Sequence, residues 1–155
     1  MIQRVQSIYL LFASLVILGL FLFPLAHGLY VNGKLVDIAI TGVYENVNGQ
    51  LKPVETFVAL TGVTILAAII PLVIIFFYKD RKKQIALCYS AIFLLIGYSF
   101  WMAQTVKKVV GEITLEYKNM GIGIFLTSLS IVLIILAAKS IKRDEKLVRS
   151  ADRLR

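Results

Sequence analysis

Four long apolar stretches constrain the fold of this chain more than any other feature of its sequence. They cover about residues 8–26, 57–78, 85–105 and 121–138, and none has Asp, Glu, Lys, Arg or His in its central part. A helix that crosses a bilayer needs about 20 such residues. The 155-residue chain is 59% hydrophobic and 17% charged, whereas soluble domains are about 45–50% apolar and about 25% charged. The pattern therefore predicts an α-helical membrane bundle of four transmembrane helices and argues against a soluble enzyme or a disordered chain.

The first apolar stretch also resembles a signal peptide, because it follows the short basic start Met1–Arg4. However, its apolar run is longer than a typical signal-peptide core, and the small-residue cleavage pattern around Pro24–Ala26 is poor. We therefore expect this stretch to be retained as the first helix.

Lysine and arginine predict the orientation of the chain, since cytoplasmic loops of membrane proteins are enriched in both. With both termini in the cytoplasm, that side carries twelve basic and four acidic residues, and the opposite side carries five of each. The short loop between the second and third stretches contributes Lys79, Arg81, Lys82 and Lys83 as topology determinants. This distribution accounts for the net charge of +8, so we expect no nucleic-acid partner.

The first outer loop, residues 27–56, has the pattern of a small antiparallel sheet. It contains two Asn-Gly pairs, Asn32-Gly33 and Asn48-Gly49, each flanked by β-favouring residues. Asn-Gly is the strongest short signal for a hairpin turn, because a type I′ turn needs positive φ at both central positions. We expect hairpins over 29–40 and 43–54, with 112–117 of the second outer loop as one further strand.

The C-terminal tail, residues 139–155, lacks proline and glycine and is predicted to continue the fourth helix into the cytoplasm. A narrow apolar stripe includes Ile141 and Val148. One interpretation is a basic helix that fixes topology and lies on anionic phospholipid headgroups. The other is a docking helix for a membrane protein, favoured by the interspersed acids. Either role would use Lys142, Arg143, Asp144, Glu145, Lys146, Val148, Arg149, Asp152, Arg153 and Arg155.

No set of residues has the pattern of a catalytic, cofactor or metal site. His27 is interpreted as a polar group at the outer end of the first helix, and Cys88 as a small packing residue. Glu112 and Glu116 lie four residues apart on the outer side, but no calcium-loop pattern accompanies them. We therefore expect no enzyme activity, no cofactor and no metal.

A small channel or transporter is the alternative function. Asp, Glu, Lys, Arg or His residues inside the membrane normally mark ion or proton paths, and the four apolar stretches have none of them in their central parts. Their serine, threonine and tyrosine side chains are typical of contacts between helices. A single bundle of four helices has little room for a pore, so a channel would have to form from several copies of the chain.

Three segments resemble a known family: the opening MIQRVQSIYL (1–10), the loop YKDRKKQ (78–84), and the ending IKRDEKLVRSADRLR (141–155). They are similar to the uncharacterised Bacteroidetes membrane family catalogued as domain of unknown function 4293, over essentially the whole chain. The resemblance implies a small bacterial inner-membrane protein with four helices. It implies no activity and no catalytic residue.

Together these observations predict a single polytopic membrane domain spanning residues 1–155, with a small periplasmic sheet and both termini in the cytoplasm. The predicted function is that of a non-enzymatic accessory or scaffold subunit of a membrane complex. Its expected partners are the lipid bilayer, anionic headgroups and a membrane protein.

Overall fold

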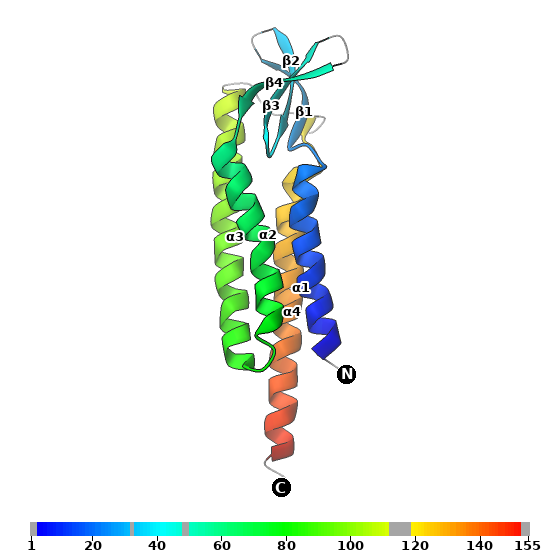
Figure 1. Ribbon diagram of the computed structural model, residues 1–155, viewed down its shortest axis with the longest axis vertical. Coiled ribbons are helices and arrows are strands. Elements are labelled where there is room, and N and C mark those ends of the chain that lie inside the picture. Colours follow the sequence, from blue (N-terminus) through cyan, green and yellow to red (C-terminus); the bar gives the residue numbers. More distant parts are fainter. Residues whose placement is uncertain (1–2, 32, 48–49, 112–118, 153–155) are drawn as a thin grey trace.

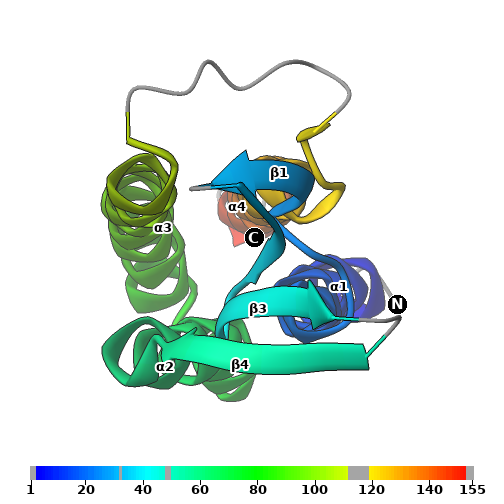
Figure 2. The same ribbon diagram turned by 90° about the horizontal axis from the view of Figure 1, so that it is seen from above.

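The helices of this computed structural model lie side by side in an elongated bundle, and a small sheet lies across one end of it (Figure 1). The structure describes residues 3–31, 33–47, 50–111 and 119–152. The N-terminal end of the first helix and the C-terminal end of the last lie at the end of the bundle away from the sheet. Figure 2 shows the strands crossing above the helix ends.

The helices in the described ranges are α1 (Gln3–Leu18), α2 (Val58–Phe76), α3 (Arg81–Val110) and α4 (Gly123–Asp152). A short 3-10 turn, η1 (Gly19–Phe21), continues α1. By length and composition, α2, α3 and the segment Gly123–Val148 of α4 could each cross a membrane. The first helix is shorter, with its apolar part at Val5–Phe21.

The first helix ends earlier than the apolar stretch 8–26 suggested. Pro24 disfavours helical geometry at the residue before it, and β1 already begins at Ala26. In contrast, α3 and α4 extend beyond their apolar stretches. The N-cap of α3 is Asp80, and its last turn contains Lys107 and Lys108, which interact favourably with the helix dipole. Hydropathy therefore located the helices, while caps and proline determined their ends.

Each helix turns one side toward the bundle, and small residues let the backbones come close. Buried positions include Ala13 on α1, Ala67 and Ala68 on α2, Ala91 on α3 and Ala137 on α4. The outward sides are also apolar. Phe12, Phe93 and Phe125 are 53%, 78% and 62% exposed. The bundle thus has an apolar core and an apolar outer surface.

The sheet is a four-stranded antiparallel meander of β1 (Ala26–Val31), β2 (Lys34–Ala39), β3 (Gly42–Val47) and β4 (Gln50–Thr56), in that order. The two predicted hairpins are confirmed, and the pairing of β2 with β3 joins them.

The ends of the paired strands agree with the two turns that the Asn-Gly pairs predict. Val31 pairs with Lys34, and Val47 pairs with Gln50, so two residues connect the strands in each hairpin. Gly33 has a φ of 77°, as a type I′ turn requires. Asn32, Asn48 and Gly49 lie outside the described residues, as does the further strand expected at 112–117.

Backbone hydrogen bonds hold the sheet on the bundle. Leu25 N donates to Ile38 O at 2.7 Å, and Phe57 N donates to Thr41 O at 2.9 Å. Thr61 Oγ1 on α2 donates to Ile40 O at 3.2 Å. Because Ile38 and Ile40 are fully buried, the inner side of the sheet belongs to the same core as the helices.

The start of α4 packs against the turn between η1 and β1. Gly121 N donates to Leu25 O at 2.8 Å, and Gly123 N donates to Pro24 O at 3.1 Å. Asn119 Nδ2 donates to the carbonyl oxygens of His27 at 3.1 Å and of Gly28 at 2.8 Å. These contacts join residues between 91 and 99 positions apart and set where α4 begins.

Candidate functional site

The tail was the main candidate site in the sequence, and it forms the part of α4 that extends past the other helices (Figure 1). The predicted continuous helix is confirmed as far as Asp152. Lys142, Arg143 and Lys146 are exposed on it. Leu147 and Val148 are also exposed, at 50% and 43%. The projecting segment therefore presents two large apolar side chains among basic ones.

The predicted apolar stripe of the tail does not form one surface. Ile141 is fully buried against the bundle, whereas Val148, two turns later, is exposed. The stripe divides because the bundle ends between these two positions. The side chains of Arg149 and of residues 151–155 lie outside the described ones.

Asp144 is directed into the bundle and not outward. Its side chain is only 5% exposed, and its Oδ2 accepts a hydrogen bond from Gln6 Nε2 on α1, which is equally buried. Its second oxygen, Oδ1, has no hydrogen-bond partner among the described atoms. This carboxylate thus connects α1 to α4 and is removed from the surface on which a partner would dock. Glu145, the next acidic residue, is partly buried.

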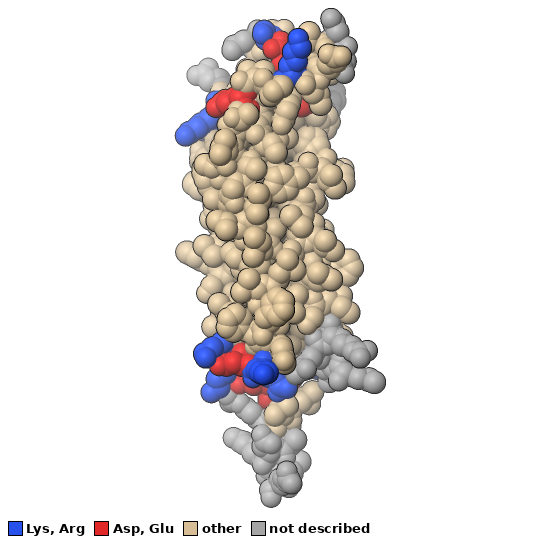
Figure 3. Space-filling view, in the orientation of Figure 1, with Lys and Arg blue, Asp and Glu red and all other residues tan. Residues whose placement is uncertain are grey.

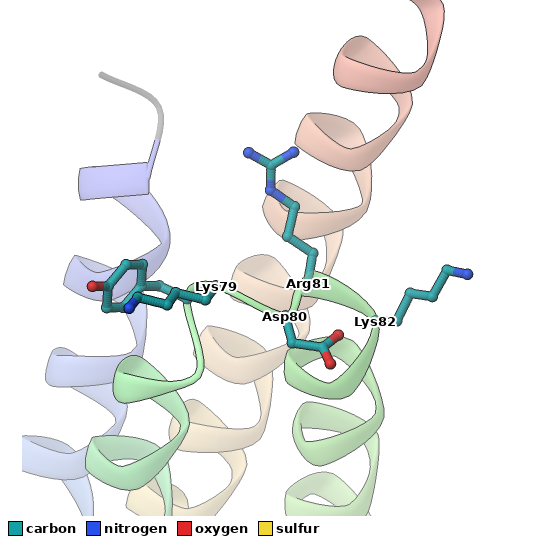
Figure 4. Close-up of a pocket in the computed structure, with 5 residues that line it drawn as sticks. Lys79, Asp80, Arg81 and Lys82 are labelled. Carbon is teal, nitrogen blue, oxygen red and sulfur yellow. The ribbon is translucent and has the colours of Figure 1, made fainter. Parts of the chain in front are cut away.

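Three of the four predicted topology determinants, Lys79, Arg81 and Lys82, line a shallow depression of about 660 Å³ at the loop between α2 and α3, together with Tyr78 and Asp80. The side chains of Lys79, Arg81 and Lys82 point in different directions there (Figure 4). A surface of this kind, open and basic, suits headgroups or counterions better than a buried substrate.

Asp80 in this loop caps α3. Its Oδ1 accepts from Lys83 N at 3.2 Å, and its Oδ2 lies 3.1 Å from Lys83 Nζ. The backbone hydrogen bond from Lys83 holds the pKa of Asp80 below its ordinary value, with the Lys83 side chain as the next cause. The stabilising effect of the cap is therefore fully present at neutral pH and is lost as the pH falls through that lowered pKa.

The polar side chains inside the bundle donate to neighbouring backbones or to one another. Ser14 Oγ on α1 donates to Ala68 O on α2 at 2.7 Å, and Ser130 Oγ on α4 donates to Ala13 O at 3.1 Å. Thr64 Oγ1 and Tyr98 OH lie 2.6 Å apart. These groups join helices and do not converge on a polar cavity.

The remaining sequence candidates are dispersed. His27 lies exposed on β1 and not at a helix end, and Cys88 is fully buried on α3. Asp37 Oδ1 accepts from Gly28 N at 2.8 Å, and Glu45 pairs with Lys34 at 3.1 Å, so both acids serve the sheet. Among the described residues, no three His, Cys, Asp or Glu side chains come close enough to hold a metal. Glu112 and Glu116 lie outside them.

A cleft of about 350 Å³ lies between the sheet and the end of α3, and sequence reasoning missed it. Valines from all four strands and from α3 line it, together with two basic and two acidic side chains. One basic and one acidic residue of this lining, Lys34 and Glu45, already form an ion pair. The cleft therefore has no excess of either charge with which to select an ion.

The outer side of α2 and α3 has a second feature that sequence reasoning missed, an apolar groove between the two helices. Small residues at facing positions, Ala67 on α2 and Ala91 on α3, contribute to it. The two alanines are visible in the sequence among larger apolar residues. However, the periodic pattern of one helix does not show which residues of another helix it faces.

A model of the family described as "Domain of unknown function (DUF4293)" matches residues 2–154. Neither the curated proteins nor the solved structures contain a significant match to the chain. The family match covers the bundle, the sheet and the projecting tail together.

Proposed function

The chain belongs to the DUF4293 family, and from this premise we propose that it is a non-enzymatic inner-membrane protein, an accessory subunit that docks a membrane partner with its projecting tail. The four helices cross the bilayer, the sheet lies in the periplasm, and both termini lie in the cytoplasm. The exposed pair Leu147 and Val148, on a helix that extends past the bundle, is the observation that carries the docking role.

The membrane placement is supported by a charge-free belt around the bundle. Charged side chains gather at the two ends of the molecule, and the middle of the visible face has none (Figure 3). On α3, residues 84–106 contain no charged residue, which corresponds to about 35 Å of helix. The hydrocarbon core of a bilayer is about 30 Å thick. Exposing the phenylalanine side chains of this belt to water would cost free energy, whereas contact with lipid chains would not.

The orientation can be tested with reporters at the two ends of the bundle. A reporter fused after Arg155 is expected to be active only in the cytoplasm, because that end carries most of the basic residues. A reporter inserted between Val47 and Gln50, which pair across a two-residue turn, is expected to be active only in the periplasm. A periplasmic C-terminus would overturn the orientation and the assignment of the tail to the cytoplasm.

The docking role of the tail makes a second prediction. In mild detergent, the wild-type protein is expected to purify with one stoichiometric membrane partner. Replacing Leu147 and Val148 together by alanine should weaken this complex at least tenfold, since exposed apolar anchors dominate such interfaces at about 1 kcal/mol or more each. The association is measured by size-exclusion chromatography coupled to light scattering.

The matched control replaces Leu129 and Val132, which are exposed on the same helix inside the belt, by alanine and should keep the partner. A complex that survives the Leu147 and Val148 change would place the interface elsewhere. A pure homo-oligomer without a second chain would contradict the accessory role and favour the channel alternative.

A further inference from the structure

An apolar groove runs along the outside of the bundle between α2 and α3. It comprises two cavities of about 230 Å³ and about 540 Å³. Both are lined by Leu66, Ile70, Ala91 and Leu94, so they lie next to each other along the two helices. Apart from Ser90 and Tyr98, its lining residues are apolar.

The groove follows from the spacing of side chains on the two helices. Leu66, Ile70, Val73 and Phe77 form a row at intervals of four, three and four along α2, and therefore share one side of that helix. Small residues form the floor between the helices. The groove is the space that larger side chains would fill at these positions. The floor residues are Ala67, Pro71 and Ala91, which are all buried.

On α3, the row of side chains that faces this side of α2 begins with a basic residue, Lys83. Leu87, Ser90 and Leu94 line the groove, and Lys83 lies one turn before Leu87 on the same side of the helix. The side chain of Lys83 is 72% exposed, and its Nζ is 3.1 Å from Asp80. With Lys79, Arg81 and Lys82 beside it, this end of the groove has a net positive charge.

The groove is long enough to span the hydrocarbon part of one leaflet of a bilayer. Its lining extends along α2 from Val63 to Phe77, which is about 21 Å of helix. Half of the hydrocarbon core is about 15 Å. An extended acyl chain that starts at the basic end would therefore lie inside the groove along its entire length.

We propose that this groove binds one acyl chain of an anionic phospholipid, with the lipid phosphate at the Lys83 end. The proposal rests on the membrane placement proposed above. An acyl chain is thin enough to enter the groove. A transmembrane helix, about 10 Å across with its side chains, would fit only over its mouth. The positive charge at one end and the apolar lining elsewhere match the two parts of a single lipid molecule.

The experiment uses the full-length protein in a neutral detergent, titrated with phosphatidylglycerol or with phosphatidylcholine of identical acyl chains. Native mass spectrometry measures the fraction of protein that carries one lipid. The wild type is expected to bind phosphatidylglycerol several-fold more tightly. Ala91→Leu fills the floor of the groove and should weaken binding of both lipids about tenfold. Lys83→Gln should weaken only phosphatidylglycerol, about fivefold.

Two matched controls make the same chemical changes outside the groove. Ala86→Leu adds the same atoms at an exposed position of α3, and Lys108→Gln removes a lysine at the opposite end of that helix. Both should bind lipid as the wild type does. If Ala91→Leu fails to fold, Ser90→Phe narrows the groove from its exposed wall and is expected to have the same effect.

The proposal is overturned if the groove-filling variants bind phosphatidylglycerol like the wild type, or if Lys83→Gln leaves the preference between the lipids unchanged. A protein dimer that Ala91→Leu dissociates would also overturn it, because a second copy would then occupy the groove. Failure of the membrane placement has a different signature, which is release of the wild-type protein from membranes by alkaline carbonate without detergent.

Discussion

Gly121→Ala is expected to lower the free energy of unfolding by about 3 kcal/mol or more. A Cβ atom at this position would overlap the carbonyl oxygen of Pro24 and lie 2.7 Å from the carbonyl carbon. These are backbone atoms, which cannot rotate away as a side chain can. The start of α4 would have to move, which breaks the hydrogen bond from Gly121 N to Leu25 O. Thermal unfolding in detergent measures the loss.

Two glycines inside helices provide the control for this prediction. A Cβ at Gly62 on α2 or at Gly97 on α3 would meet no atom within 4 Å. Alanine at these positions should leave stability unchanged or raise it by up to about 1 kcal/mol, because alanine has the higher helix propensity. If Gly121→Ala behaved like them, the close approach of α4 to Pro24 would not constrain the fold.

Gln6→Leu is expected to destabilise the protein by about 2–3 kcal/mol, because it leaves the buried Asp144 carboxylate without the amide that donates to it. Because Asp144 is only 5% exposed, water cannot replace the lost hydrogen bond, as it would at an exposed ion pair. The stability of the variant is measured by denaturant or thermal unfolding in the same detergent.

The double variant Gln6→Leu with Asp144→Leu separates the lost contact from the buried charge. It should recover most of the stability, because removing both polar partners eliminates the desolvation cost of each. A double variant as unstable as the single one would mean that the contact between α1 and α4 depends on packing at these positions. A single variant within about 0.5 kcal/mol of the wild type would show that the carboxylate does not need Gln6.

Local patterns in the sequence were sufficient to predict the elements of this fold. Apolar stretches free of charge located the helices, because side-chain hydropathy depends on composition over a short window. The Asn-Gly pairs located two hairpins, because the φ requirement of a two-residue turn concerns only the turn itself. The absence of helix breakers after residue 138 predicted the long tail helix, which the structure confirms as far as Asp152.

The candidate site was predicted less completely, and the reason is geometric. The tail was identified, but the sequence did not show which of its side chains are buried and which are exposed. The apolar and charged residues alternate in the same way along the whole tail, while the bundle ends partway along it. Asp144 was predicted to be one of the docking acids. Instead, it accepts a hydrogen bond from Gln6, 138 positions away in the sequence. The apolar groove was missed because it depends on small residues of two helices facing each other.

The sequence by itself therefore determined the helices, the hairpins and the separation of charge from the apolar belt, all of which depend on neighbours within a few residues. Only the tertiary structure decided that Asp144 turns inward, that Gly121 lies against Pro24, and that Ala67 and Ala91 leave a groove between α2 and α3. These outcomes are set by contacts between distant segments. Such contacts form only when close packing fixes the rotation and depth of each helix against the others.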